Sequence, residues 1–196
     1  LAEAGFLKND VLGINQLDKL TDICDLIKAN GKEVPDIFNL PEDKEVYRYY
    51  CNGWNSDVFQ MKSSGLSDYC KSMKPMEMND LVATTALYRP GPMGSGYHTQ
   101  YAKCKNEGVA PKYLWGTEEI TKNTFGLIVF QEQIMEICKV VGGLDALEAD
   151  SVRKAMGKKK LSELLPWKER VLKGFLEKGA TEAQFNEFWD AAIEFA

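Results

Sequence analysis

The sequence has 196 residues, of which 44% are apolar and 27% are charged, and its formal net charge is −5. This balance argues against intrinsic disorder, which combines low hydrophobicity with high net charge, and the chain is long enough to bury a core. No run of about 18 apolar residues occurs, so we expect no membrane-spanning helix and no membrane partner.

Five cysteines are scattered without a CxxC pair, and His98 is the only histidine. This pattern predicts neither a disulfide framework nor a thiolate zinc site, and a His-rich metal site is excluded. A reducing compartment is the natural setting, so we expect a cytoplasmic protein.

The two ends of the chain suggest a piece excised from a longer protein. The first residue is Leu1 rather than Met, and residues 185–196 stop inside an apolar helical pattern without a capping glycine or lysine. A natural end, or a disordered tail absent from the sequence, is the alternative.

The N-terminal third predicts two short strands and two helices. Residues 6–14 form a short apolar run typical of a strand, with Lys8 and Asp10 on one face. Apolar residues at helical spacing predict a helix over 15–30, and a shorter helix is expected over 41–50. A second brief strand is expected at 58–61.

The middle of the chain predicts two more helices and one irregular segment. A small-residue turn opens a helix over 66–73, and a further helix covers 78–87. Two prolines and three glycines in 87–96 argue against regular structure there. Because Arg89 precedes Pro90, we expect its backbone to be extended and its direction to be fixed at the end of the helix.

The C-terminal half predicts only helices. The apolar run in 126–143 becomes a helix, and a helix over 146–156 follows with Asp145 as its N-cap. Two further helices are expected in 161–196, separated near 179–181. The fold class is therefore mainly α with a few short β-strands.

Positive charge is concentrated in one part of this acidic chain. Residues 150–173 contain eight basic and three acidic residues, a local net charge of +5 that leaves −10 on the rest. A basic island on an acidic chain is typical of a phosphate-binding site. A solvated, lysine-rich helix end favoured by the helix dipole is the alternative.

Five segments, in this order, resemble the alpha subunit of bacterial DNA polymerase III, the C-family replicative polymerase. They are LKNDVLG at 7–13, VFQMKSSGL at 58–66, ALYRPGPM at 86–93, TFGLIVFQEQIMEI at 124–137 and EADSVRKAMGKKK at 148–160. The resemblance spans nearly the whole chain. It implies that residues 1–14 are the end of a palm-domain strand and that residues 15–196 are a fingers domain, truncated at its C-terminal end.

The resemblance also implies a role for Asp10. It would be one of three catalytic aspartates of the palm that hold two Mg²⁺ ions, and its two partners, expected upstream in a PDxDxDF segment, are absent from this sequence. A single carboxylate cannot hold two ions about 3.5 to 4 Å apart. The chain alone is therefore expected to bind Mg²⁺ weakly or not at all and to lack polymerase activity.

By the same resemblance, the fingers hold an incoming deoxynucleoside triphosphate, which calls for guanidinium groups, lysines and backbone donors. The expected nucleotide-binding residues are Lys8, Ser63, Ser64, Gly65, Arg89, Arg153 and Lys154. The run Lys158, Lys159 and Lys160 is expected to contact DNA or phosphate. Expected partners are the triphosphate, primer-template DNA and other replicase subunits.

Three positions depart from the family pattern. Lys154 stands where a second arginine is common, Lys62 where glutamate is usual, and Val11 where phenylalanine is common. A lysine keeps the charge of an arginine but loses its bidentate geometry.

Two other functions remain open at this point. The chain could be a standalone nucleotide- or nucleic-acid-binding module without catalysis. It could also be a helical interaction scaffold without a phosphate site.

Overall fold

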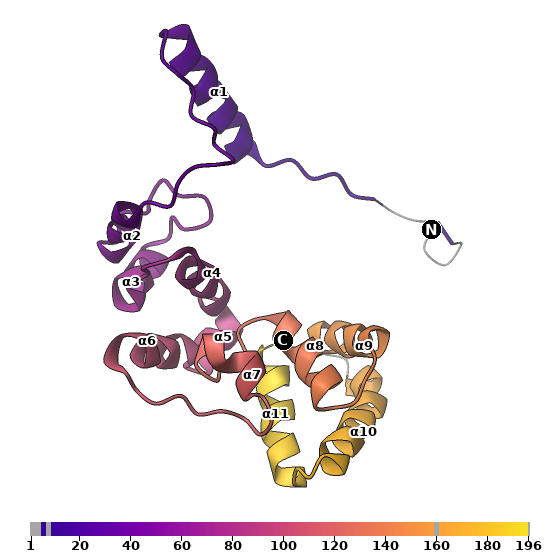
Figure 1. Ribbon diagram of the computed structural model, residues 1–196. Helices are drawn as coiled ribbons and strands as arrows, with labels where there is room; N and C mark the ends of the chain where they lie inside the picture. The colour runs from indigo at the N-terminus through magenta and orange to yellow at the C-terminus, as the bar shows by residue number, and fades with distance from the viewer. Residues whose placement is uncertain (1–4, 7–8, 159–160, 196) are drawn as a thin grey trace. The chain divides into compact units, whose positions relative to one another are not determined.

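The computed structural model describes residues 5–6, 9–158 and 161–195, and the side chains of all of these except 161 and 162. The chain forms two compact units, 1–43 and 44–196. Figure 1 shows helices joined by loops and turns. No strand occurs in the described residues, so the prediction of a few short β-strands is wrong.

The first unit contains helix α1, Asn15–Ala29. The predicted helix over 15–30 is confirmed, and Asn30 closes it by donating from its side-chain amide to the Leu26 carbonyl at 2.8 Å. None of the residues of α1 is buried. The strand expected at 6–14 is absent from the described residues of that segment, which offer no second strand to complete a ladder.

The strand expected at 58–61 is replaced by consecutive turns. The Val58 N–H donates to the Asn55 carbonyl and the Met61 N–H donates to the Val58 carbonyl, both at 3.1 Å. Gln60 has a φ of 60°, a left-handed conformation that interrupts an extended run. The Asn55 amide closes the loop by donating to the Met61 carbonyl.

The second unit contains the remaining helices of the described chain. The first five are α2 Lys44–Cys51, α3 Ser64–Met73, α4 Met78–Leu87, α5 Pro90–Gly94 and α6 Tyr97–Glu107. The others are α7 Glu118–Thr121, the 3₁₀ helix η2 Lys122–Thr124, α8 Gln131–Val140, α9 Ala146–Gly157, α10 Leu161–Glu177 and α11 Glu182–Phe195. The predicted helices over 78–87 and 146–156 and the final pair are confirmed.

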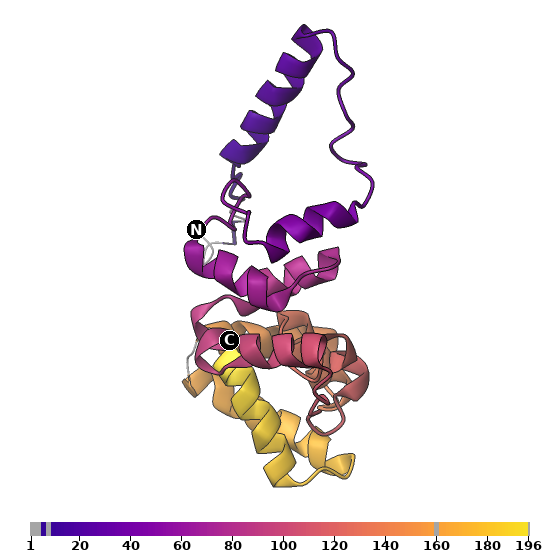
Figure 2. The same cartoon turned by 90° about the vertical axis from the view of Figure 1, so that its left-hand side faces the viewer.

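Helix α5 contradicts the prediction that 87–96 lacks regular structure. Pro90 occupies the first helical position, where its missing N–H costs nothing and its fixed φ suits a helix. Helix α5 packs against α11, and a Cβ at Gly91 would lie 3.2 Å from the Glu194 carbonyl oxygen. Figure 2 shows the end of α11, in yellow, reaching this part of the second unit.

An N-terminal cluster of buried side chains lies among α3, α4 and α6. Its members are Met61, Leu66, Tyr69, Cys70, Met73, Ala83, Leu87, Tyr101, Leu127 and Val129. Helix α6 completes the C-terminal end of α3: Lys105 donates to the Lys74 carbonyl at 2.7 Å, and Asn106 donates to the Ser72 carbonyl at 2.9 Å. These carbonyls, which have no N–H donor inside α3, thereby gain a hydrogen-bond partner.

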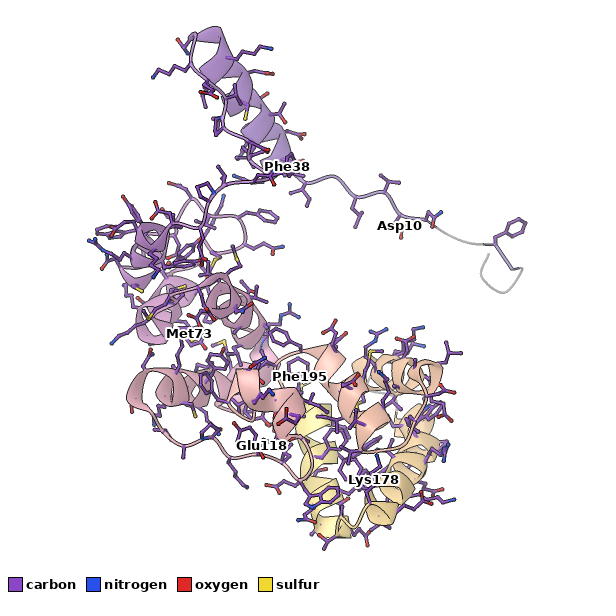
Figure 3. The ribbon with its side chains drawn as sticks, viewed as in Figure 1. Asp10, Phe38, Met73, Glu118, Lys178 and Phe195 are labelled. Atoms are coloured by element: carbon purple, nitrogen blue, oxygen red, sulfur yellow. The ribbon has the colours of Figure 1, made fainter. Side chains whose placement is uncertain are left out.

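A C-terminal cluster joins helices α8 to α11. Its largest buried side chains are those of Phe175, Phe185, Phe188 and Trp189, which contact one another through their rings. Helix α10 comes very close to the end of α8, because a Cβ built at Gly174 would overlap the Gly142 carbonyl. Lys178, labelled in Figure 3, donates to the Val140 carbonyl and caps the same helix end.

Among the residues that the structure describes, no helix is both long enough and apolar enough to cross a bilayer.

Candidate phosphate-binding site

Helix α9 begins at a capping box that fixes its start. The Asp145 side chain accepts from the Glu148 N–H at 2.8 Å, and the Glu148 side chain accepts from the Asp145 N–H at 2.9 Å. The sequence-predicted N-cap is therefore confirmed.

One face of α9 is buried and the other carries the basic residues. Ala149, Val152, Ala155 and Met156 belong to the C-terminal cluster, where α9 packs against α8 and α10 (Figure 1). Because a helix has 3.6 residues per turn, Arg153 and Lys154 then lie on the outward face of α9. The side chains of Arg153 and Lys154 are 30% and 62% exposed, so both cations reach solvent.

A single carboxylate holds these two cations. Oδ1 of Asp150 accepts from Nε of Arg153 at 3.0 Å and from its Nη2 at 2.8 Å, while Oδ2 lies 2.6 Å from Nζ of Lys154. Gln131, the first residue of α8, accepts from Nη1 of Arg153 at 3.2 Å. The expected residues Arg153 and Lys154 thus share one partner on α9, and Arg153 is also anchored from α8.

The same contacts lower the pKa of Asp150. Its hydrogen bond with Lys154 is the largest cause and its bond with Arg153 is the second, because both cations stabilise the ionised carboxylate. Asp150 is therefore ionised at neutral pH, and the group of three carries one net positive charge.

The rest of the basic island is largely paired with acidic side chains. Arg170 lies 3.7 Å from Glu148, and Lys173 lies 3.8 Å from Glu177. Both acids lie outside residues 150–173, so the local net charge of +5 overstates the positive electrostatic potential of this region. Lys168 has no ion pair within the part of the chain that the structure describes.

The lysine run that follows α9 is only partly described. Lys158 lies 3.8 Å from Glu163 and is exposed. Lys159 and Lys160 lie outside the described residues, so the expected contact of this run with DNA or phosphate stays a prediction.

A second group of expected residues meets at the start of α3. Ser63 is the N-cap, and its hydroxyl oxygen accepts from the Leu66 N–H at 3.3 Å. Ser64 and Gly65 are the first two residues of the helix, so their N–H groups have no intrahelical acceptor. The predicted turn is therefore a capped helix start whose first N–H groups have no partner inside the helix.

Because Gly65 has no side chain, a tyrosine packs closely against this helix start. A Cβ at Gly65 would overlap the hydroxyl of Tyr88, the residue before Arg89. Arg89 has the extended backbone expected before Pro90, with φ −132° and ψ 156°, and is exposed. Within the described residues its side chain has no hydrogen bond or ion pair.

The two groups lie on different parts of the second unit. Helix α3 packs against α2, α4 and α6, whereas α9 packs against α8 and α10, and Figure 1 shows them on opposite sides of α5. The structure therefore brings together Arg153 with Lys154 on α9, and Ser63 with Ser64 and Gly65 at the start of α3, as two separate sets. Arg89 is grouped with the second set only through its chain neighbour Tyr88, which contacts Gly65.

Asp10 belongs to the first unit. It is exposed, on the extended segment before α1, as Figure 3 shows. The described residues contain no group of three His, Cys, Asp or Glu side chains placed to hold a metal ion. The donor set present therefore does not fit two Mg²⁺ ions, which need several carboxylate oxygens. Lys8, expected beside Asp10, lies outside the described residues.

Comparison with known proteins identifies the family. The model of the bacterial DNA polymerase III alpha subunit finger domain matches residues 16–179. The DNA polymerase III subunit alpha of Aquifex aeolicus is 36% identical over 198 residues, which cover 100% of this chain and 17% of that protein. Those of Saccharopolyspora erythraea and Mycobacterium tuberculosis are each 38% identical over 198 residues, with 98% of this chain and 17% of theirs covered.

The chain belongs to the finger-domain family of bacterial DNA polymerase III alpha subunits. It spans about 17% of the length of these curated relatives. The finger-domain match begins at residue 16, after Asp10, and includes both sets of phosphate-contact candidates.

Two polar residues of the finger domain were missed from the sequence. Asp150 lies three and four residues before Arg153 and Lys154, a helical spacing at which side chains meet, so its pairing was readable. Gln131 contacts Arg153 across 22 positions of sequence, and helical periodicity gives no signal for such a tertiary contact.

The other glutamine of the FQEQ segment is structural. Gln133 is buried, and its Oε1 accepts from the N–H groups of Val129 and Phe130 at 2.8 and 3.0 Å. Its amide donates to the Thr124 hydroxyl at 2.8 Å. These bonds fix the start of α8, and thereby the position of Gln131.

Proposed function

We propose that this chain supplies the phosphate contacts of a DNA-directed DNA polymerase, in which it holds the incoming deoxynucleoside triphosphate beside primer-template DNA. Residues 15–196 serve as the fingers in this proposal, and residues 1–14 as the edge of the palm. The whole protein acts in bacterial replication, in the cytoplasm and with other replicase subunits.

The paired cations on α9 carry the proposal. Arg153 and Lys154 share one anionic partner, Asp150, whose two oxygens lie 2.6 to 3.0 Å from their nitrogen atoms. A phosphate group also presents anionic oxygens to such donors, and guanidinium binds them in the same charge-assisted manner. A site that holds a carboxylate in this way has the chemistry to hold a phosphate.

The α3 set supports a second phosphate contact. The N–H groups of Ser64 and Gly65 point out of the start of a ten-residue helix, where the helix dipole favours anions. Arg89 lies next to Tyr88, which contacts this turn through Gly65. We assign this set to triphosphate or to DNA phosphate, and Lys158 to Lys160 to DNA.

Asp10 keeps its proposed role as a catalytic, metal-binding residue only for the whole protein. Its partner carboxylates would come from outside this sequence, so the 196-residue chain by itself is expected to be inactive as a polymerase.

The test is calorimetric titration of the 196-residue chain with deoxyadenosine triphosphate and Mg²⁺. We expect Arg153→Ala to weaken binding by about 10-fold or more, since charged hydrogen bonds contribute about 1.5 to 3 kcal/mol. Lys173→Ala is the matched control, because Lys173 pairs with Glu177 on α10 and should leave affinity within about twofold. Absence of binding to the folded wild type, or equal affinity of Arg153→Ala, contradicts the proposal.

A further inference from the structure

We propose that Asp150 is a positioning residue that presets Arg153 and Lys154 for one phosphate group. This inference rests on the proposed function. It assigns to an acidic side chain a favourable role in binding an anion.

The hydrogen bonds leave part of the guanidinium group available. Arg153 has five N–H donors, of which three are used: Nε–H and one Nη2–H donate to Asp150, and one Nη1–H donates to Gln131. One donor on each terminal nitrogen remains. The plane of the group is fixed from two directions, and the remaining donors can meet a phosphate without a further loss of side-chain freedom.

Both anchors stand on packed helices. Asp150 lies beside Ala149, which is fully buried in the C-terminal cluster, so its backbone cannot shift freely. Gln131 begins α8, whose start is held by the hydrogen bonds that the buried side chain of Gln133 accepts from Val129 and Phe130. An arginine fixed by partners on rigid elements loses less conformational entropy when a ligand binds.

Lys154 is held by the second oxygen of the same carboxylate. Residues 153 and 154 diverge by about 100° around a helix axis, so neighbouring side chains do not face the same point by themselves. The bond from Lys154 to Oδ2 of Asp150, together with the bonds from Arg153 to Oδ1, draws the two cations to one side of α9.

A purely electrostatic role of Asp150 and a positioning role predict opposite changes in triphosphate affinity when its charge is removed. Asp150 repels a triphosphate, so loss of its charge should strengthen binding if charge alone matters. If Asp150 positions the cations, the same change should weaken binding, because an asparagine has a single acceptor oxygen in place of two charged ones. The sign of the change therefore decides between them.

The experiment compares Asp150→Asn, Asp150→Glu and the control Glu132→Gln in titrations with deoxyadenosine triphosphate and Mg²⁺, and with inorganic triphosphate. We expect Asp150→Asn to weaken binding by about three- to tenfold and Asp150→Glu to restore most of the affinity. Glu132 is exposed beside Gln131 and makes no described contact with Arg153, so its variant reports the effect of charge alone. Melting temperatures check that each variant is folded.

Nuclear magnetic resonance of the free protein gives a second measurement. Rotation of the Arg153 guanidinium should be slow in the wild type and fast in Asp150→Asn, an effect that does not depend on triphosphate binding. Equal rotation in both proteins overturns the inference.

The outcomes separate this inference from the proposed function. If the wild type binds, Arg153→Ala weakens binding and Asp150→Asn leaves it equal or tighter, the positioning role is wrong and the proposed function stands. If the wild type does not bind triphosphate, both fail.

Discussion

The two hydrophobic clusters of the second unit are built from different kinds of side chain. In the C-terminal cluster Phe175 stacks on Phe188 with ring centroids 5.2 Å apart and meets Phe185 edge-on at 5.4 Å. The N-terminal cluster instead contains tyrosines whose hydroxyl groups need partners, and Tyr69 donates to the His98 carbonyl at 3.1 Å. Ring packing therefore dominates the C-terminal cluster, whereas the N-terminal cluster also contains a side-chain hydrogen bond from a buried tyrosine.

This difference bears on the two sets of phosphate-contact candidates. Helix α9, which carries Arg153, rests on the C-terminal cluster, whereas α3, which begins at Ser64, rests on the N-terminal cluster. The platform under Arg153 should therefore respond mainly to changes in volume. The platform under the start of α3 should respond also to changes in ionisation.

The largest expected effect is on packing. Phe188→Ala should lower the free energy of unfolding by about 3 to 5 kcal/mol, because it removes a fully buried ring from the centre of the C-terminal cluster. Urea denaturation followed by circular dichroism measures this change. A loss below about 1 kcal/mol would show that the cluster does not depend on this ring.

A smaller effect is expected where the two clusters meet. In 127–129, Ile128 belongs to the C-terminal cluster while its neighbours Leu127 and Val129 belong to the N-terminal one. Gln133→Leu should cost about 2 kcal/mol or more, since it leaves the buried N–H of Val129 and the half-buried N–H of Phe130 without their acceptor. The matched control for urea denaturation is the exposed Glu132→Gln, and equal stability of the two variants would contradict this assignment.

The smallest expected effect is a difference between the two clusters in how much stability is lost at alkaline pH. Burial raises the pKa of Cys70 to about 11 and that of Tyr101 to about 12 in the N-terminal cluster, and the pKa of Cys138 to about 12 in the C-terminal one. The unfolded chain loses these protons at lower pH than the folded chain, so stability falls as pH rises from the ordinary pKa values towards the raised ones.

The measurement is the pH dependence of urea unfolding between pH 8 and 11. Replacement of Cys70 by Ala together with Tyr101 by Phe should reduce the loss of stability about 1.4 times as much as Cys138→Ala, because Tyr101 begins to ionise in the unfolded chain only near its ordinary pKa of 10.0. Equal slopes in the two variants would show that the clusters do not differ in this respect.

Sequence reasoning found the helices whose signals are local. The helix over 78–87 has the predicted bounds, and Asp145 caps α9 as predicted, because periodicity and capping depend on neighbouring residues. It failed at 58–61, where a short apolar run without a partner strand forms turns. It also failed at 90–94, where proline begins a helix rather than preventing one.

The candidate site divides in the same way. The pairing of Asp150 with Arg153 follows a spacing of three along one helix and could be read from the sequence. The contact of Arg153 with Gln131, and the space that Gly65 leaves for Tyr88, depend on how distant segments pack. No local pattern encodes such contacts.

The end of helix α3 sets an order of events during synthesis. The carbonyls at this end accept hydrogen bonds from residues made later. Lys105 follows Lys74 by 31 positions, and Asn106 follows Ser72 by 34. A ribosome adds about 5 to 20 residues each second, so the end of α3 lacks these partners for seconds after α3 itself has been made. The end of α3 therefore acquires its final hydrogen bonds only once α6 has been made.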